Sequence, residues 1–186
     1  MDDGPGARRA LINRAIGQLD ALSDAVTPQE FGRTVQKLLA FSFEALGYSV
    51  TENPVGVPDL QVESSADGSC LAIEVKTGNP ITISRRDLDG VQGHGQQGVL
   101  AALMFPDSHP RWCLVDATTL SPGRIEVRRL ARAPQVDTAL DVQATFLSLV
   151  AAIPTEVLLY RKALGDWADV QRRQGWRSRI PDQLRE

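Results

Sequence analysis

Apolar residues recur at helical spacing through the first quarter of the chain, which predicts two amphipathic helices. The first covers residues 7–25. The second begins after Thr27, with Pro28 at the first helical position and Glu30 two residues further on. Threonine followed three residues later by glutamate is the spacing of a capping box, and Gly47 is a natural residue to end the helix. The apolar stripe of the second helix predicts burial against a sheet.

Shorter apolar runs in the middle of the chain predict strands rather than helices. We expect these strands at residues 48–51, 59–63, 70–76, 99–105, 112–115 and 125–127. Asp67-Gly68 is a hairpin-turn signal between the second and third of them. The continuous apolar run of the fourth strand is typical of burial on both faces. A helix is expected over residues 83–97, capped by Thr82 or Ser84, although its three glycines disfavour regular helix.

Two further helices are predicted at residues 138–152 and 155–172, followed by a loose basic tail at 172–179. The order of elements predicts one α/β domain, a sandwich in which a central mixed sheet is flanked by helices. Its core would cover about residues 27–130, with the first helix before it. A C-terminal helical extension would occupy about residues 136–186.

The composition is that of a globular protein, with 42% hydrophobic and 23% charged residues. No apolar run reaches the ~18–20 residues of a membrane span, and the N-terminus lacks a signal-peptide pattern, so a cytoplasmic protein is expected. Cys70 and Cys113 lie in apolar strand-like runs and are expected to be buried free thiols. The formal net charge of −3 does not favour indiscriminate nucleic-acid binding. Contact with DNA or RNA would need a local basic patch or a metal ion that offsets clustered carboxylates.

Three ionisable side chains are expected on one face of the central hairpin. Strand alternation places Asp59 on one face of its strand, and Glu74 and Lys76 on one face of the next. If the turn is of even length and centred on its Asp-Gly pair, Asp59 lies opposite Lys76, and Gln61 lies opposite Glu74. Asp59 and Glu74 are then diagonal neighbours with Cβ atoms roughly 5–8 Å apart. An odd-length loop or a bulge would change this register.

Two carboxylates at this separation could hold one divalent ion between them. With water and the backbone carbonyl of Val75 they suit Mg²⁺ or Mn²⁺, which favour oxygen ligands. Such an ion polarises a scissile phosphate and helps to ionise a bound water, and Lys76 could orient that water and stabilise hydroxide. The chain has no zinc-ligand spacing, phosphate-binding loop or nucleophilic-serine elbow.

Pro58-Asp59 followed by Glu74-Val75-Lys76 resembles the motif of the PD-(D/E)XK nuclease superfamily. The helix before the hairpin and the apolar strand after it resemble the restriction-endonuclease-like and archaeal Holliday-junction-resolvase-like branches. The resemblance implies a restriction-endonuclease-like fold. It also implies that Asp59 and Glu74 are metal ligands and that Lys76 is the catalytic lysine.

Members of this superfamily often add an acidic residue from the helix that precedes the sheet. Glu30 is the first candidate and Glu44 the second, although the capping box explains Glu30 whatever the function. Some branches also place a glutamine in the helix after the lysine. Gln92 could fill that role, with Gln96 or Gln97 as alternatives.

The resemblance covers about residues 27–120 and implies a Mg²⁺-dependent endonuclease that hydrolyses phosphodiester bonds in DNA, in restriction, defence or repair. Arg85 and Arg86 open the helix beside the expected site and could contact phosphates. A homodimer is expected, and the C-terminal helices could form its interface or bind a protein partner. Three alternatives stay open. One is a non-cleaving module of the same fold that binds nucleic acid or a protein partner. Another is an ordinary cross-strand ion pair on a solvated face. The third is a protein-interaction domain unrelated to nucleases, which would require a different hairpin register.

Overall fold

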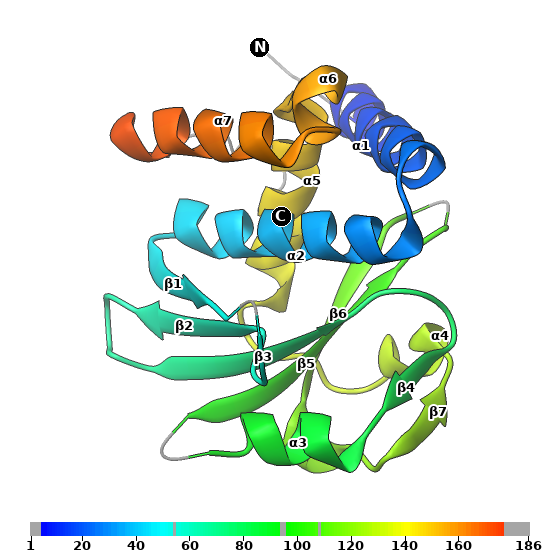
Figure 1. Ribbon diagram of the computed structural model, residues 1–186, viewed down its shortest axis with the longest axis vertical. Coiled ribbons are helices and arrows are strands. Elements are labelled where there is room, and N and C mark those ends of the chain that lie inside the picture. The colour runs from blue at the N-terminus through cyan, green and yellow to red at the C-terminus, as the bar shows by residue number, and fades with distance from the viewer. Residues whose placement is uncertain (1–4, 54, 94–95, 108, 177–186) are drawn as a thin grey trace. The chain divides into compact units, whose positions relative to one another are not determined.

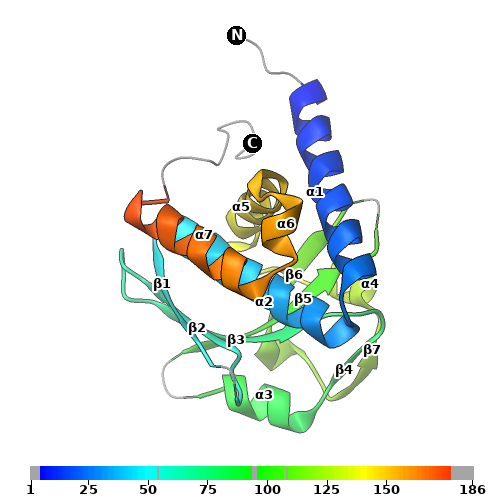
Figure 2. The same ribbon diagram turned by 45° about the horizontal axis from the view of Figure 1, so that its top comes forward.

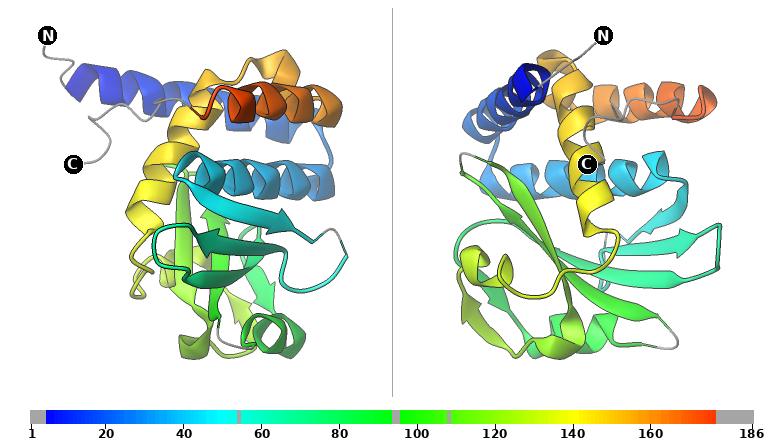
Figure 3. Two further views of the ribbon diagram at one scale, coloured as in Figure 1. Left: turned by 90° about the vertical axis from the view of Figure 1, so that its left-hand side faces the viewer. Right: turned by 180° about the vertical axis from the view of Figure 1, so that it is seen from behind.

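A five-stranded mixed sheet carries the predicted hairpin in a computed structural model that describes residues 5–53, 55–93, 96–107 and 109–176. The strand order is β1-β2-β3-β5-β6, with β3 and β5 parallel and the other neighbouring pairs antiparallel. The sheet is twisted, as both views in Figure 3 show. This arrangement confirms the predicted α/β class with a central mixed sheet. The strands are β1 (Tyr48–Glu52), β2 (Leu60–Ser64), β3 (Cys70–Lys76), β5 (Gln97–Met104) and β6 (Arg111–Asp116).

The described residues form two compact units. The sheet unit runs from Gly47 to Ala139 and contains the whole predicted hairpin. The helical unit combines the residues up to Leu46 with those from Leu140 onward. The predicted core at residues 27–130 therefore draws on both units.

One face of the sheet is covered by four short elements of the sheet unit, which lie below and to the right of the sheet in Figure 1. They are β4 (Ile81–Ile83), α3 (Arg85–Val91), β7 (Gly123–Ile125) and α4 (Val127–Leu130). We call residues 79–91 and 123–133, which contain these elements, the covering layer. Strand β4 pairs with β7 in an antiparallel ribbon, and the short helix η1 (Ala117–Thr119) follows β6.

The covering layer is held to the sheet by an apolar core. Buried side chains of the layer meet buried side chains of β3, β5 and β6, among them Ile81, Leu88, Leu130, Ala72, Leu100 and Cys113. Each fully buried leucine or isoleucine contributes about 1.5–3 kcal/mol relative to exposure. The core therefore fixes the start of α3 above the C-terminal end of β3.

The hairpin turn has even length, but its centre is one residue earlier than predicted. The Ser64 N–H donates to the Ser69 carbonyl at 2.8 Å, which closes a loop of four residues. Gly68 takes a φ of +70° at the last position of that loop, where its lack of a Cβ removes the steric cost. The Asp67 carboxylate accepts hydrogen bonds from the Ser69 N–H and hydroxyl.

The observed register corrects the predicted pairing. Gln61 lies opposite Ala72 rather than Glu74. The ladder ends with Leu60 opposite Ile73, and the same register continued by one more residue places Asp59 opposite Glu74 instead of Lys76. Because the shift is an even number of residues, Glu74 and Lys76 stay on the predicted face. That face packs against the covering layer and Glu74 is buried, so the alternative of an ion pair on a solvated face is wrong.

Some elements of the sheet unit also differ from the prediction. Helix α3 ends at Val91 instead of residue 97, because the chain must return to β5 at Gly98, where a Cβ would lie 2.7 Å from the Val91 carbonyl oxygen. Strand β4 was not predicted, since three residues are too few for a clear pattern. The expected strand 125–127 ends at Ile125, and α4 begins at Val127, whose N–H donates to the Asn79 side chain.

The helical unit consists of five helices among the described residues, and α6 contacts both α1 and α7 (Figure 2). They are α1 (Pro5–Ala25), α2 (Pro28–Ala45), α5 (Ala139–Ala152), α6 (Thr155–Leu158) and α7 (Arg161–Arg173). The predicted helix 155–172 is therefore two helices. The capping box at the start of α2 is confirmed in both directions.

The beginning of the predicted basic tail is not loose. Arg172 belongs to α7 and donates two hydrogen bonds to the Glu44 carboxylate, at 2.9 and 3.0 Å. The Trp176 ring packs against Phe41 and Trp167. These contacts hold the residues within the helical unit. The rest of that tail, residues 177–179, lies outside the described residues.

Both cysteines are free thiols, as predicted, with Cys113 buried and Cys70 half-buried. In the described part of the chain, no helix combines the length and the apolar character needed to cross a bilayer.

Candidate active site

Asp59 is fixed beside the end of β3 by the backbone of that strand. Its Oδ2 accepts a hydrogen bond from the Val75 N–H at 2.8 Å. The N–H and C=O of one strand residue point to the same side, so the Val75 carbonyl also faces the side of Asp59. The carboxylate therefore sits where the β2–β3 ladder ends, next to Glu74.

Lys76 joins two carboxylates that come from different elements. Its Nζ donates to Glu74 Oε1 at 2.8 Å and lies 3.1 Å from Asp87 Oδ2. The side chains are 22%, 8% and 12% exposed for Lys76, Glu74 and Asp87. Ion pairs so poorly exposed to water are screened weakly, which makes this an electrostatically strong cluster.

Asp87 is the site residue that sequence reasoning missed. Its carboxylate accepts from the Ser84 N–H at 2.7 Å, and its own N–H donates to the Ser84 hydroxyl at 3.1 Å. Serine and aspartate three residues apart have the spacing of a capping box, and this signal was present in the sequence. Only the packing of α3 on the sheet shows that the same carboxylate also holds Lys76.

Negative charge exceeds positive charge in this cluster, with three carboxylates around one ammonium group. Burial raises the pKa of Glu74 to about 7 and outweighs the hydrogen bond from Lys76, which lowers it; the nearby charge of Asp59 raises it further. Burial also raises the pKa of Asp59, although the Val75 N–H and Lys76 lower it. For Lys76, burial lowers the pKa, but Glu74 and Asp87 raise it more, so the ammonium form is favoured.

Glu74 Oε2 is buried and has no hydrogen-bond partner among the described residues. A buried polar atom without a partner costs about 1–3 kcal/mol, and more when it carries charge. The Asp59 and Glu74 side chains lie within hydrogen-bonding reach of each other, and with the Val75 carbonyl they supply hard oxygen donors of the kind that Mg²⁺ or Mn²⁺ prefers. Among the described residues no three His, Cys, Asp or Glu side chains are grouped to hold a metal. An ion would therefore depend on two carboxylates, one carbonyl and water.

The accessory acids of the sequence prediction lie in the helical unit. Glu30 accepts from the Thr27 N–H and hydroxyl, and these hydrogen bonds lower its pKa. Glu44 is engaged by Arg172. Both carboxylates thus have local structural partners.

Of the glutamines, Gln92 follows the last residue of α3, at the opposite end from Asp87, and donates to the Ala117 carbonyl at 3.3 Å. Gln97 donates to Asp116 at 3.1 Å. Arg85 and Arg86 are exposed at the start of α3 and line an open groove that also contains Val57. The structure thus brings together Asp59, Glu74 and Lys76, with the arginines beside them.

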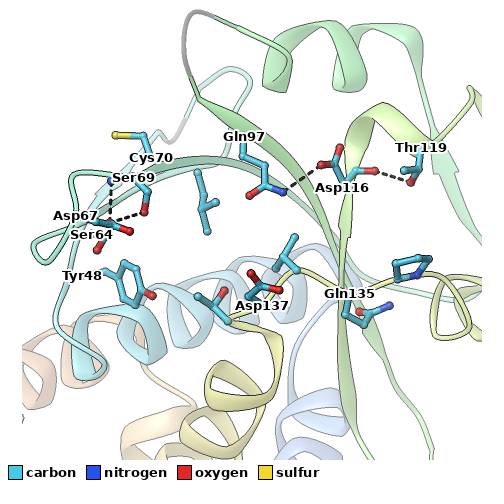
Figure 4. Close-up of a pocket in the computed structure, with 14 residues that line it drawn as sticks. Tyr48, Ser64, Asp67, Ser69, Cys70, Gln97, Asp116, Thr119, Gln135 and Asp137 are labelled. Carbon is cyan, nitrogen blue, oxygen red and sulfur yellow. Dashed lines mark hydrogen bonds between the residues drawn. The ribbon is translucent and has the colours of Figure 1, made fainter.

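A separate cavity of about 660 Å³ lies at the opposite end of the strands (Figure 4). Three aspartates line it, Asp67, Asp116 and Asp137. Asp67 is bonded to Ser69, and Asp116 accepts hydrogen bonds from Gln97 and Thr118. None of the described residues that line this cavity is a lysine or an arginine. It is therefore not an extension of the carboxylate–lysine cluster.

Close packing between α3 and the loop before Asp59 gives a test of how that carboxylate is positioned. A Cβ on Gly90 would overlap Val57 Cγ1 and lie 2.7 Å from Val57 Cβ, so Gly90→Ala must displace the loop or the helix. We expect a loss of about 1–3 kcal/mol in the free energy of unfolding and weaker Mn²⁺ binding, measured by denaturant titration and calorimetry. Gly17→Ala in α1, where a Cβ meets nothing within 4 Å, should instead stabilise the protein by about 0.5–1 kcal/mol. Equal effects of the two substitutions would contradict this positioning.

A solved structure with partial similarity is that of Hjc, a Holliday junction resolvase from the archaeal hyperthermophile Archaeoglobus fulgidus. The TM-score is 0.41 and the sequence identity 19%, and the match covers 53% of this chain and 93% of the resolvase. No family model matches the chain, and no curated protein matches its sequence. A functional assignment therefore depends on the geometry of the cluster.

Proposed function

We propose that the protein is a Mg²⁺- or Mn²⁺-dependent endonuclease that hydrolyses phosphodiester bonds in DNA. The observation that carries this proposal is the buried, unpartnered Glu74 Oε2 beside Asp59, in a cluster that has more carboxylates than ammonium groups. Lys76 is already paired with Glu74 and Asp87, so a purely structural ion pair needs neither the third carboxylate, that of Asp59, nor the unpaired oxygen Glu74 Oε2. A divalent cation would bind to both.

Each residue then has a distinct role. Asp59, held by the Val75 N–H, and Glu74 would be the metal ligands, together with the Val75 carbonyl. When bound, the ion supplies Lewis-acid chemistry, polarising the scissile phosphate and lowering the pKa of a coordinated water. Lys76, fixed by Glu74 and Asp87, would orient the attacking water and stabilise its ionised form as a positive point charge. The homodimer stays a prediction.

Cleavage of DNA tests the proposal directly. Linear, nicked, branched and single-stranded DNA should be incubated with the protein and Mg²⁺, with EDTA as the control. Cleavage of any of them that requires the metal is the expected result. If DNA binds, no substrate is cut, and Mn²⁺ releases no heat on titration, the non-cleaving module is the better description.

The pH dependence of metal binding follows from Glu74. Its pKa of about 7 means that below pH 7 the ion must displace a proton. Calorimetric Mn²⁺ titrations should therefore show the apparent affinity falling about tenfold per pH unit below 7 and levelling above it. Without metal, the folded state binds this proton more tightly than the unfolded state, so stability should fall as pH rises from 4.5 to about 7. A metal affinity that is flat from pH 5.5 to 8.5 would contradict the role of Glu74.

A further inference from the structure

Positive and negative charges are separated within the sheet unit. The covering layer contains six arginines and three acidic residues, a formal charge of about +3. The remaining residues of the sheet unit contain two basic and eight acidic residues, a formal charge of about −6. A chain with a net charge of −3 therefore has a local basic surface, which the total charge conceals.

Most of these arginines are exposed and face away from the core. In the ribbon, Arg124 lies opposite Thr82, and both side chains are exposed. In α4, Val127 and Leu130 are buried, while Arg128 and Arg129 project outward.

Few of these charges are used in ion pairs. Arg128 is paired with Asp107 at 3.7 Å. The other five arginines form no ion pair with the described residues, and they are Arg85, Arg86, Arg124, Arg129 and Arg132. Exposed arginines that are not neutralised by the protein remain available to an external anion.

The basic surface continues into the candidate active site. The groove that contains Arg85 and Arg86 is also lined by Asp89, Gly90 and Val57, and Val57 lies two residues before Asp59. One residue after Arg86, Asp87 turns inward to Lys76. The same short helix, α3, thus carries two exposed arginines and also the aspartate that holds the lysine of the cluster.

We propose that the covering layer is the surface that binds the phosphate backbone of duplex DNA and delivers it to the cluster. This inference rests on the proposed function, because it names the surface through which that substrate is held. Arginines suit phosphate through bidentate hydrogen bonds, and backbone contacts of this kind do not depend on base sequence. The aspartate-lined cavity at the other end of the strands repels phosphate, so duplex DNA should not approach from there (Figure 4).

The test is the salt dependence of binding to a fluorescent 25-base-pair duplex, measured by anisotropy in EDTA so that nothing is cut. Each phosphate contact contributes a slope of about −0.9 to log K against log salt. The Arg124→Ala/Arg129→Ala variant should reduce the slope magnitude by about 1.8 and weaken binding at least roughly tenfold at 0.1 M salt. Arg9→Ala/Arg14→Ala, which removes two exposed arginines of α1, is the matched control and should leave slope and affinity unchanged. Thermal unfolding verifies that both variants are folded.

Failure of this inference is distinguishable from failure of the proposed function. An unchanged slope in the covering-layer variant, an equal loss in the control, or no duplex binding by the wild-type protein at 50 mM salt overturns the inference. If wild-type protein nevertheless cuts DNA with Mg²⁺, the proposed function stands without it. If the covering-layer variant alone loses binding but wild-type protein never cuts, the surface is confirmed and the nuclease assignment is not.

Discussion

Replacing Glu74 by glutamine should remove metal-dependent cleavage while leaving the metal-free protein at least as stable as wild type. The amide keeps an oxygen that can accept from Lys76, and Asp87 still pairs with the ammonium. The substitution removes the negative charge of a buried carboxyl group, and burial already disfavours the ionised form of that group. We expect cleavage to fall by two to three orders of magnitude, about 3–4 kcal/mol of transition-state stabilisation, with no measurable Mn²⁺ binding.

The stability readout separates an active site from a structural ion pair. Breaking a buried ion pair by removing one partner typically costs about 3–5 kcal/mol. If Glu74 served only to pair with Lys76, Glu74→Gln should show a large loss in urea unfolding at pH 8. Glu63→Gln, an exposed position on the adjacent strand β2, is the matched control and should change neither cleavage nor stability. Undiminished cleavage by Glu74→Gln would eliminate the proposed metal site.

The sequence specified the hairpin well because its local signals agree. Alternating apolar residues in β2 and β3, a turn at Asp67-Gly68 and the capping box of the preceding helix all favour the same arrangement. The remaining error, an offset of one residue in the turn centre, arises because Gly68 suits the last position of a four-residue loop as well as the centre of a shorter one.

Tertiary contacts explain what could not be predicted. Asp87 reads as a helix cap in the sequence, and only the packing of α3 brings it to Lys76. The burial of Glu74 likewise depends on a layer whose elements, β4 and α4, are too short to show periodicity. Glu30 illustrates the reverse case, in which a local cap is a sufficient explanation of an acidic residue.

Replacing Lys76 by methionine should have the largest effect on stability, because it leaves three carboxylates without their ammonium group. At pH 8 and without metal we expect a loss of about 3–5 kcal/mol in the free energy of unfolding. Because the hydrogen bond from Lys76 lowers the pKa of Glu74, that pKa should rise further in the variant. When the pKa of an acid is raised in the folded state, the protein loses stability as the pH rises toward that pKa. The stability difference between Lys76→Met and wild type should therefore shrink at pH 5.5, where Glu74 is protonated in both proteins.

Metal and a second substitution should each offset this loss, which ties the stability effect to the cluster charge. Mn²⁺ should recover part of the deficit at pH 8, since binding to the folded state alone stabilises it by mass action. Lys76→Met/Asp87→Asn should also recover part, since it removes one of the three negative charges. Cleavage should remain at least about 100-fold below wild type in both variants, because neither restores the ammonium group near the attacking water. Lys162→Met on the exposed surface of α7 is the control. A Lys76→Met protein as stable as wild type from pH 5.5 to 8 would show that the ammonium group is not the counter-charge of the cluster. A Lys76→Met protein that still cuts DNA would show that it is not a catalyst.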